Sequence, residues 1–175
     1  MKIEKLIESK IREVPDWPKK GISFKDITPL LEDGDAFLKV INALALPYKE
    51  SKIDKVVGID ARGFIFASAV AYKLKTGLAI VRKKGKLPYE TISKSYSLEY
   101  GKNVLEIHKD SIKKGERVAI IDDVLATGGT AKAVISLVEK LGGKIIGISF
   151  LSELSYLKGR KLLGNKNIKS LIKYN

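Results

Sequence analysis

The chain has 175 residues, of which 45% are hydrophobic and 30% are charged, the balance of one soluble globular domain. It contains no cysteine, which excludes disulfides, thiolate catalysis and sulfur-ligated metals and fits a reducing cytoplasm. No stretch approaches the roughly 18 apolar residues of a membrane helix, the charged N-terminus does not resemble a secretory signal, and the net charge of +13 keeps nucleic acid open as a partner.

The first elements in chain order are two helices. Residues 3–14 have apolar side chains at helical spacing, and the stretch DWPKKG ends this helix. A second helix is expected at 35–48. Apolar strands and helices then alternate, with strands expected at 55–60, 78–82, 117–123, 144–152 and 169–174 and helices at 63–77 and 130–143. This alternation predicts parallel βαβ units, and so an α/β fold whose central parallel sheet is flanked by helices.

The segment from residue 83 to residue 115 breaks this rhythm. It is polar, rich in Gly, Ser and Tyr, and contains NVLEIH at 103–108, which is expected as an antiparallel excursion. We find no internal repeat and no convincing linker, so residues 1–175 are expected to form a single domain. Residues 158–175 contain six Lys and Arg and no acidic residue, and we interpret this run as a solvated surface.

The stretch VAIIDDVLATGGTAKAV, residues 118–134, carries the strongest functional signal. A predicted strand delivers Asp122 and Asp123, and a run of small residues then turns into a helix. Ligands of parallel sheets bind at the carboxyl ends of the strands, and exposed N–H groups at a helix start can converge on a phosphate. We call residues 126–130 the phosphate loop; its members are Ala126, Thr127, Gly128, Gly129 and Thr130. No G-K-[ST] follows, so this is not a Walker loop.

The two carboxylates beside this loop need a partner other than phosphate, because phosphate repels them. Ionised carboxylates accept hydrogen bonds from the adjacent hydroxyls of a sugar. A sugar phosphate carries both groups at about the required separation. The stretch therefore predicts that the loop binds a phosphate while Asp122 and Asp123 bind the ribose.

An apolar strand, an Asp pair and T-G-G-T together resemble the motif with which type I phosphoribosyltransferases bind 5-phosphoribosyl 1-diphosphate (PRPP). Further stretches resemble the adenine-using branch of that family, and they lie at 15–31, 58–74 and 82–110. Together with the loop they cover well over half of the chain. The resemblance implies a Rossmann-like fold with a small hood at about 1–34 and a flexible loop and antiparallel hairpin at about 83–115.

The resemblance also assigns a pyrophosphate site. It makes DARGF a pyrophosphate-binding loop, with Ala61 and Arg62 as contacts and a non-proline cis peptide expected between them. Arginine suits this role because its guanidinium offers a bidentate fork to a phosphate. Arg82 and Lys86 are further expected contacts, the latter reaching toward a neighbouring subunit, and Tyr100 is assigned with them. Residues 87–97 correspond to a mobile loop that closes over PRPP.

The remaining assignments concern the base and the chemistry. GISFKD resembles the family's base-binding segment, in which Phe24 stacks on the purine and the backbones of Ser23 and Lys25 read its edge. Family members commonly have a branched apolar residue and an Arg at these two positions, so base selectivity is open. Glu99 matches the proposed catalytic glutamate. The single histidine, His108, is expected to be a strand surface residue.

The implied reaction is adenine + PRPP → AMP + pyrophosphate, which makes the chain a pentosyltransferase of purine salvage (EC 2.4.2.7). Mg²⁺ is the expected cofactor, held mainly by the substrate, with no metal-binding residues on the protein. A cytoplasmic homodimer without membrane or nucleic-acid partners is expected. Two alternatives stay open: an enzyme for another purine, hypoxanthine or guanine, and a PRPP-sensing regulator that binds nucleic acid.

Overall fold

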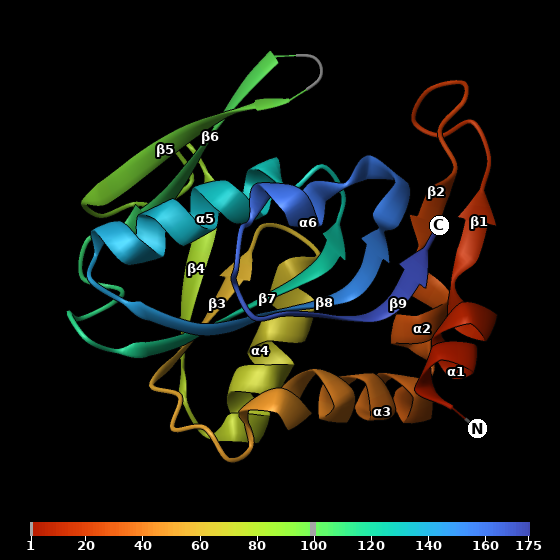
Figure 1. Cartoon of the computed structure of the whole chain (residues 1–175), viewed down its shortest axis with the longest axis horizontal. Helices are drawn as coiled ribbons and strands as arrows, with labels where there is room; N and C mark the ends of the chain where they lie inside the picture. The colour runs from red at the N-terminus through yellow and green to blue at the C-terminus, as the bar shows by residue number, and fades with distance from the viewer. Residues whose placement is uncertain (1, 99–100) are drawn as a thin grey trace.

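The fold is built on one mixed sheet, which the computed structural model describes over residues 2–98 and 101–175. Seven strands lie in the order β5-β6-β4-β3-β7-β8-β9. The five from β4 to β9 in that order run parallel, and the β5–β6 hairpin joins β4 antiparallel (Figure 1). Their bounds are β3 Lys55–Ile59, β4 Gly77–Lys83, β5 Thr91–Leu98, β6 Gly101–His108, β7 Arg117–Leu125, β8 Lys144–Leu154 and β9 Ile168–Tyr174.

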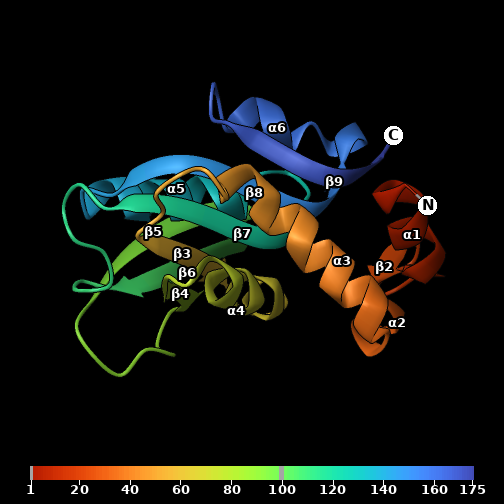
Figure 2. The same cartoon turned by 90° about the horizontal axis from the view of Figure 1, so that it is seen from below.

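Helices cover both faces of this sheet, as the predicted βαβ alternation requires. Helices α3 and α4 lie on one face and α5 on the other (Figures 1 and 2). Each face has its own apolar core, one centred on Phe66 of α4 and the other on Phe150 of β8. The helical bounds are α1 Ile3–Lys10, α2 Thr28–Glu32, α3 Gly34–Ala45, α4 Gly63–Leu74, α5 Gly129–Lys140 and α6 Gly159–Leu162, with single turns of 3₁₀ helix η1 Leu46–Tyr48 and η2 Ser155–Leu157.

The N-terminal segment departs from its predicted form. Helix α1 ends at Lys10, and residues 12–14 form strand β1 (Arg12–Val14) instead of continuing the helix to residue 14. Strand β1 pairs antiparallel with β2 (Phe24–Asp26), so that Val14 lies opposite Phe24. The hydrogen bonds of this two-stranded ribbon override the helical spacing of the sequence. The ribbon lies beside the C-terminal end of the chain (Figure 1).

The segment at 83–115 forms the expected antiparallel hairpin, but more of it is regular than the sequence indicates. Strands β5 and β6 pair from Thr91–His108 to Leu98–Gly101, so most of the predicted 87–97 loop is strand. The hairpin packs against α5, and the Tyr96 hydroxyl lies 3.3 Å from Oγ1 of Thr130. Among the described residues, no helix combines the length and the apolar character that crossing a bilayer requires.

Candidate active site

A pocket of about 380 Å³ opens at the carboxyl ends of β3 and β7. The predicted phosphate loop forms one wall, through Ala126, Thr127, Gly128 and Thr130, and Asp60, Ala61, Arg62, Asp122 and Asp123 are among the residues that line the rest. Gly129 begins α5 directly behind this wall, and no side chain caps that helix. The first N–H groups of a helix have no intrahelical partner, so α5 presents free donors to the pocket.

The two carboxylates are buried side by side but differ in their surroundings. Asp122 is 8% exposed, and its Oδ1 accepts a hydrogen bond of 2.9 Å from the backbone N–H of Asp123. It also lies so close to Gly63 that a Cβ there would be 2.4 Å from Oδ1. Burial, and then the neighbouring charge of Asp123, raise the pKa of Asp122 well above its usual value.

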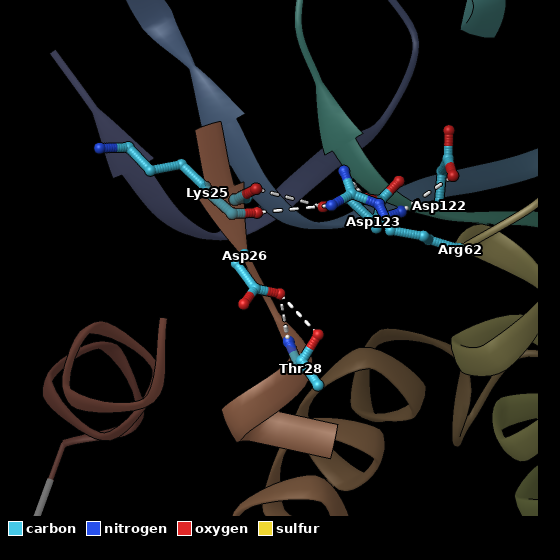
Figure 3. Close-up of polar contacts among 7 residues, drawn as sticks. Lys25, Asp26, Thr28, Arg62, Asp122 and Asp123 are labelled. Atoms are coloured by element: carbon cyan, nitrogen blue, oxygen red, sulfur yellow. Dashed lines mark hydrogen bonds and ion pairs between the residues drawn. The ribbon is translucent and has the colours of Figure 1, made fainter. Parts of the chain in front are cut away.

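Arg62 balances this negative charge. Its Nη2 lies 2.5 Å from Oδ2 of Asp123, and its Nη1 donates to the backbone carbonyl of Lys25 at 3.4 Å (Figure 3). The guanidinium carbon also sits 4.9 Å from the ring centre of Phe24. Arg62 therefore ties the strand end at Asp123 to the ribbon strand β2.

A second pocket of about 600 Å³ adjoins the first. Ser23, Phe24 and Lys25 line one side of it, and Tyr156 and Leu157 line the other. The two pockets share a wall made of Arg62, Asp123, Val124, Ala126 and Thr127. An aromatic slot thus opens directly beside the polar pocket.

The side chain of Lys25 is held away from this shared wall, as Figure 3 shows. Its Nζ lies 2.8 Å from Oε1 of Glu13 and 4.8 Å from the ring centre of Tyr174. Ser23 also donates a hydrogen bond to Glu13. The two side chains that depart from the family pattern are therefore engaged in fastening the ribbon, while the Lys25 carbonyl faces Arg62.

The remaining predicted contacts do not line either pocket in the described part of the chain. Nε of Arg82 lies 3.2 Å from Oδ2 of Asp60, and its Nη1 donates to the carbonyl of Lys86. In the described part of the chain, Arg82 and the exposed Lys86 lie outside the walls of both pockets. Glu99 and Tyr100 lie outside the described residues.

The expected position of the cis peptide was wrong by one residue. The non-proline cis bond joins Asp60 to Ala61, not Ala61 to Arg62. Arg62 already has helical dihedral angles as the N-cap of α4, so the change of direction between β3 and α4 falls before it.

Sequence reasoning missed the far wall of the second pocket. This wall consists of residues of β8 and of the turn after it, 22 to 27 positions beyond the end of the phosphate loop: Ser152, Leu154, Tyr156 and Leu157. These residues form no motif with the loop in sequence. Among the described residues, no group of three or more His, Asp or Glu side chains could hold a metal ion.

Comparison with known proteins identifies the class. The phosphoribosyl transferase domain family matches residues 30–169. An adenine phosphoribosyltransferase of Geobacter metallireducens is 57% identical over 94% of this chain and 96% of its own. The crystal structure of the enzyme from Thermoanaerobacter pseudethanolicus has a TM-score of 0.94 and 53% identity, covering 98% and 99% of the two chains.

A third relative was crystallised with a base. The Saccharomyces cerevisiae adenine phosphoribosyltransferase, complexed with adenine and an imino-altritol bisphosphate, is 38% identical with a TM-score of 0.91, covering 97% of this chain and 98% of its own. The chain belongs to the phosphoribosyltransferase family. Within that family it matches adenine phosphoribosyltransferases along nearly its full length, which confirms the fold and the activity predicted from the sequence.

Proposed function

We propose that the chain transfers the phosphoribosyl group of PRPP to adenine, giving AMP and pyrophosphate, and that it does so where the two pockets meet. The observation that carries this proposal is the shared wall, because the start of α5 and the carboxylate pair lie on one side of it and the aromatic slot lies on the other. Transfer between a sugar and a base requires such adjacent sites, because both reactants must be held in line at the anomeric carbon.

The first pocket holds the ribose 5-phosphate part of PRPP. The backbone N–H groups of the phosphate loop, with the hydroxyls of Thr127 and Thr130, bind the 5′-phosphate. Asp122 and Asp123 accept hydrogen bonds from the ribose hydroxyls. Arg62 pairs with Asp123 at the wall of this pocket, which fixes the position of that carboxylate and supports this role.

The second pocket holds adenine. The purine stacks on Phe24, whose ring already carries the Arg62 guanidinium at 4.9 Å. The backbones of Ser23 and Lys25 read the edge of the base. Since the Lys25 side chain is turned toward Glu13 and Tyr174, its replacement of the family's usual arginine leaves the reading of the base unaltered.

Pyrophosphate leaves on the side of the β3–α4 turn. The Ala61 backbone and Arg62 bind it there, and Arg82, Lys86 and Tyr100 complete the site. Asp60, the ion-pair partner of Arg82, lines the first pocket, which supports a position for Arg82 at its margin. In the transfer, the bond from C1 to the pyrophosphate oxygen breaks, a base nitrogen bonds to C1, and Glu99 exchanges the proton of the base.

The PRPP substrate, rather than protein side chains, would hold most of the coordination of the Mg²⁺ cofactor. The protein side fits this arrangement, because Asp123 is already paired with Arg62 and Asp122 is buried against Gly63. When bound, the ion supplies charge neutralisation to the diphosphate and keeps several of its waters.

The active form is a cytoplasmic homodimer. One face of α4 supports this, since Ile65 and Tyr72, seven residues apart, point outward and Tyr72 is 89% exposed. Leu78 of β4 is exposed as well. The family resemblance also implies that Lys86 reaches toward the site of the neighbouring subunit.

The test is AMP formation from adenine, PRPP and Mg²⁺ by the wild-type chain and by Phe24→Ala. The wild type forms AMP, and Phe24→Ala loses about 5- to 150-fold in adenine affinity, because stacking contributes about 1–3 kcal/mol. An absence of AMP formation, together with nucleic-acid binding that weakens steeply with salt, would instead identify a regulator.

A further inference from the structure

The phosphate loop rests on the backbone of one residue far along the chain. Gly159, the first residue of α6, lies so close that a Cβ there would be 2.0 Å from the Ala126 carbonyl oxygen and 2.7 Å from the Gly128 nitrogen. In the reverse direction, a Cβ on Gly128 would be 2.5 Å from the carbonyl oxygen of Gly159. Neither position accepts a side chain unless the loop or α6 moves.

We propose that the turn 158–160 is a brace that sets the shape of the phosphate loop, with Gly159 as its positioning residue. The proposal rests on the proposed function, because it takes the loop as the 5′-phosphate site. Gly159 lies against the loop backbone and acts through the position of the backbone N–H groups. Such donors work only when their directions converge on the ligand, so a rigid backing contributes to affinity.

The brace is anchored to the sheet by Arg160. Its Nε and Nη2 lie 3.0 Å and 2.5 Å from the two carboxylate oxygens of Glu153 in β8. Its Nη1 donates to the Ile168 carbonyl of β9 at 3.0 Å, and Ser170 joins the cluster by donating to Glu153 at 2.7 Å. Glu153 is 5% exposed, and Arg160 holds the pKa of its carboxyl below the usual value.

This anchor makes the brace a fixed element rather than a loose turn. The Arg160 guanidinium engages β8 and β9 together, and the residue before it in the chain carries the contact with the phosphate loop. The preceding turn also lines the base pocket, through Leu154, Tyr156 and Leu157. The connection from β8 to α6 thus supports both halves of the site.

The test compares Gly159→Ala with Gly34→Ala. Both glycines are the first residue of a helix, but a Cβ at Gly34 meets nothing within 4 Å. The readouts are calorimetric affinities for ribose 5-phosphate and for pyrophosphate, and the steady-state constants for PRPP. We expect Gly159→Ala to bind ribose 5-phosphate at least tenfold more weakly, with pyrophosphate affinity within twofold of wild type. The KM for PRPP rises more than kcat falls, and Gly34→Ala resembles wild type.

Two results overturn the proposal. One is a Gly159→Ala protein that binds ribose 5-phosphate as well as Gly34→Ala does. The other is an equal loss for ribose 5-phosphate and pyrophosphate, which indicates general disruption. If the wild type forms no AMP, the proposed function fails. If the wild type is active and Gly159→Ala binds ribose 5-phosphate normally, only the brace proposal fails.

If Gly159→Ala does not fold, a second variant, Arg160→Lys, tests the proposal. Arg160→Lys keeps the charge that faces Glu153 but loses the fork that engages both carboxylate oxygens and the Ile168 carbonyl. We expect ribose 5-phosphate affinity to fall threefold to tenfold, with pyrophosphate affinity unchanged. Wild-type affinity for ribose 5-phosphate in Arg160→Lys overturns the proposal.

Discussion

Replacing Asp122 by asparagine stabilises the fold at alkaline pH. Asp122 is 8% exposed, and burial together with the Asp123 charge raises its pKa. The folded state then holds this proton more tightly than the unfolded chain does. Stability of the wild type therefore falls as pH rises from the usual carboxyl range through the raised pKa of Asp122. Asparagine has no proton to lose, and its amide oxygen keeps the hydrogen bond from the Asp123 N–H.

The size of the effect follows from linkage. Each pH unit by which the pKa of Asp122 is raised corresponds to about 1.4 kcal/mol of lost stability above that pKa. For a chain of this length, 1 kcal/mol changes the melting temperature by about 2–4 °C. Asp122→Asn is therefore expected to melt above wild type at pH 8, by about 3–6 °C for each pH unit by which the pKa is raised, and the difference shrinks to nothing near pH 4.

The assay is thermal unfolding of wild type, Asp122→Asn and Asp123→Asn across pH 4–8. Asp123→Asn is the matched control, because it also removes a charge but breaks the 2.5 Å ion pair with Arg62, so a comparable gain is not expected. Asp122→Asn should also bind ribose 5-phosphate more weakly, as stability gained at a binding site commonly costs function. A melting temperature of Asp122→Asn below wild type at pH 8 would refute the reasoning.

Three further predictions concern Asp123, Glu99 and Glu153. Asp123→Asn weakens PRPP binding more than adenine binding, because the carboxylate under the ribose loses its charge; unchanged PRPP affinity in calorimetry contradicts this. Glu99→Gln lowers kcat by about 10²–10⁴-fold and removes one limb of the pH–rate profile, with binding of both substrates within a few-fold. A single-turnover rate of Glu99→Gln equal to that of wild type would contradict the catalytic role of Glu99. Because the pKa of Glu153 is lowered, its contribution to stability is lost as pH falls through that pKa, and Glu153→Gln should flatten the acid limb of unfolding curves; an unchanged limb contradicts this.

The features that sequence predicted are those set by neighbouring residues. The Asp pair lies near the end of one strand, and the phosphate loop follows that strand and opens one helix, so their placement depends on local order alone. The same holds for Arg62 at the start of α4. The geometry of such motifs is set by residues that are close in the sequence.

The features that the sequence did not predict depend on contacts between segments that are distant in the chain. Residues 12–14 have helical spacing with the preceding turn, yet they pair with 24–26 as a ribbon, because tertiary pairing outweighs local propensity. Tyr156 and Gly159 follow β8 in the chain, and they lie beside the site because β8 pairs with β7. Arg82 lies at the end of its strand as predicted, but Asp60, which follows the neighbouring strand β3, engages its side chain.

The measurement that tests the central claim most directly is a competition between adenine and hypoxanthine for PRPP. The account predicts a kcat/KM for adenine at least tenfold higher, because a 6-oxo purine leaves buried polar groups of the base edge unpaired at a cost of about 1–3 kcal/mol. Equal kcat/KM values for the two bases would contradict it and assign the chain to the broader purine class.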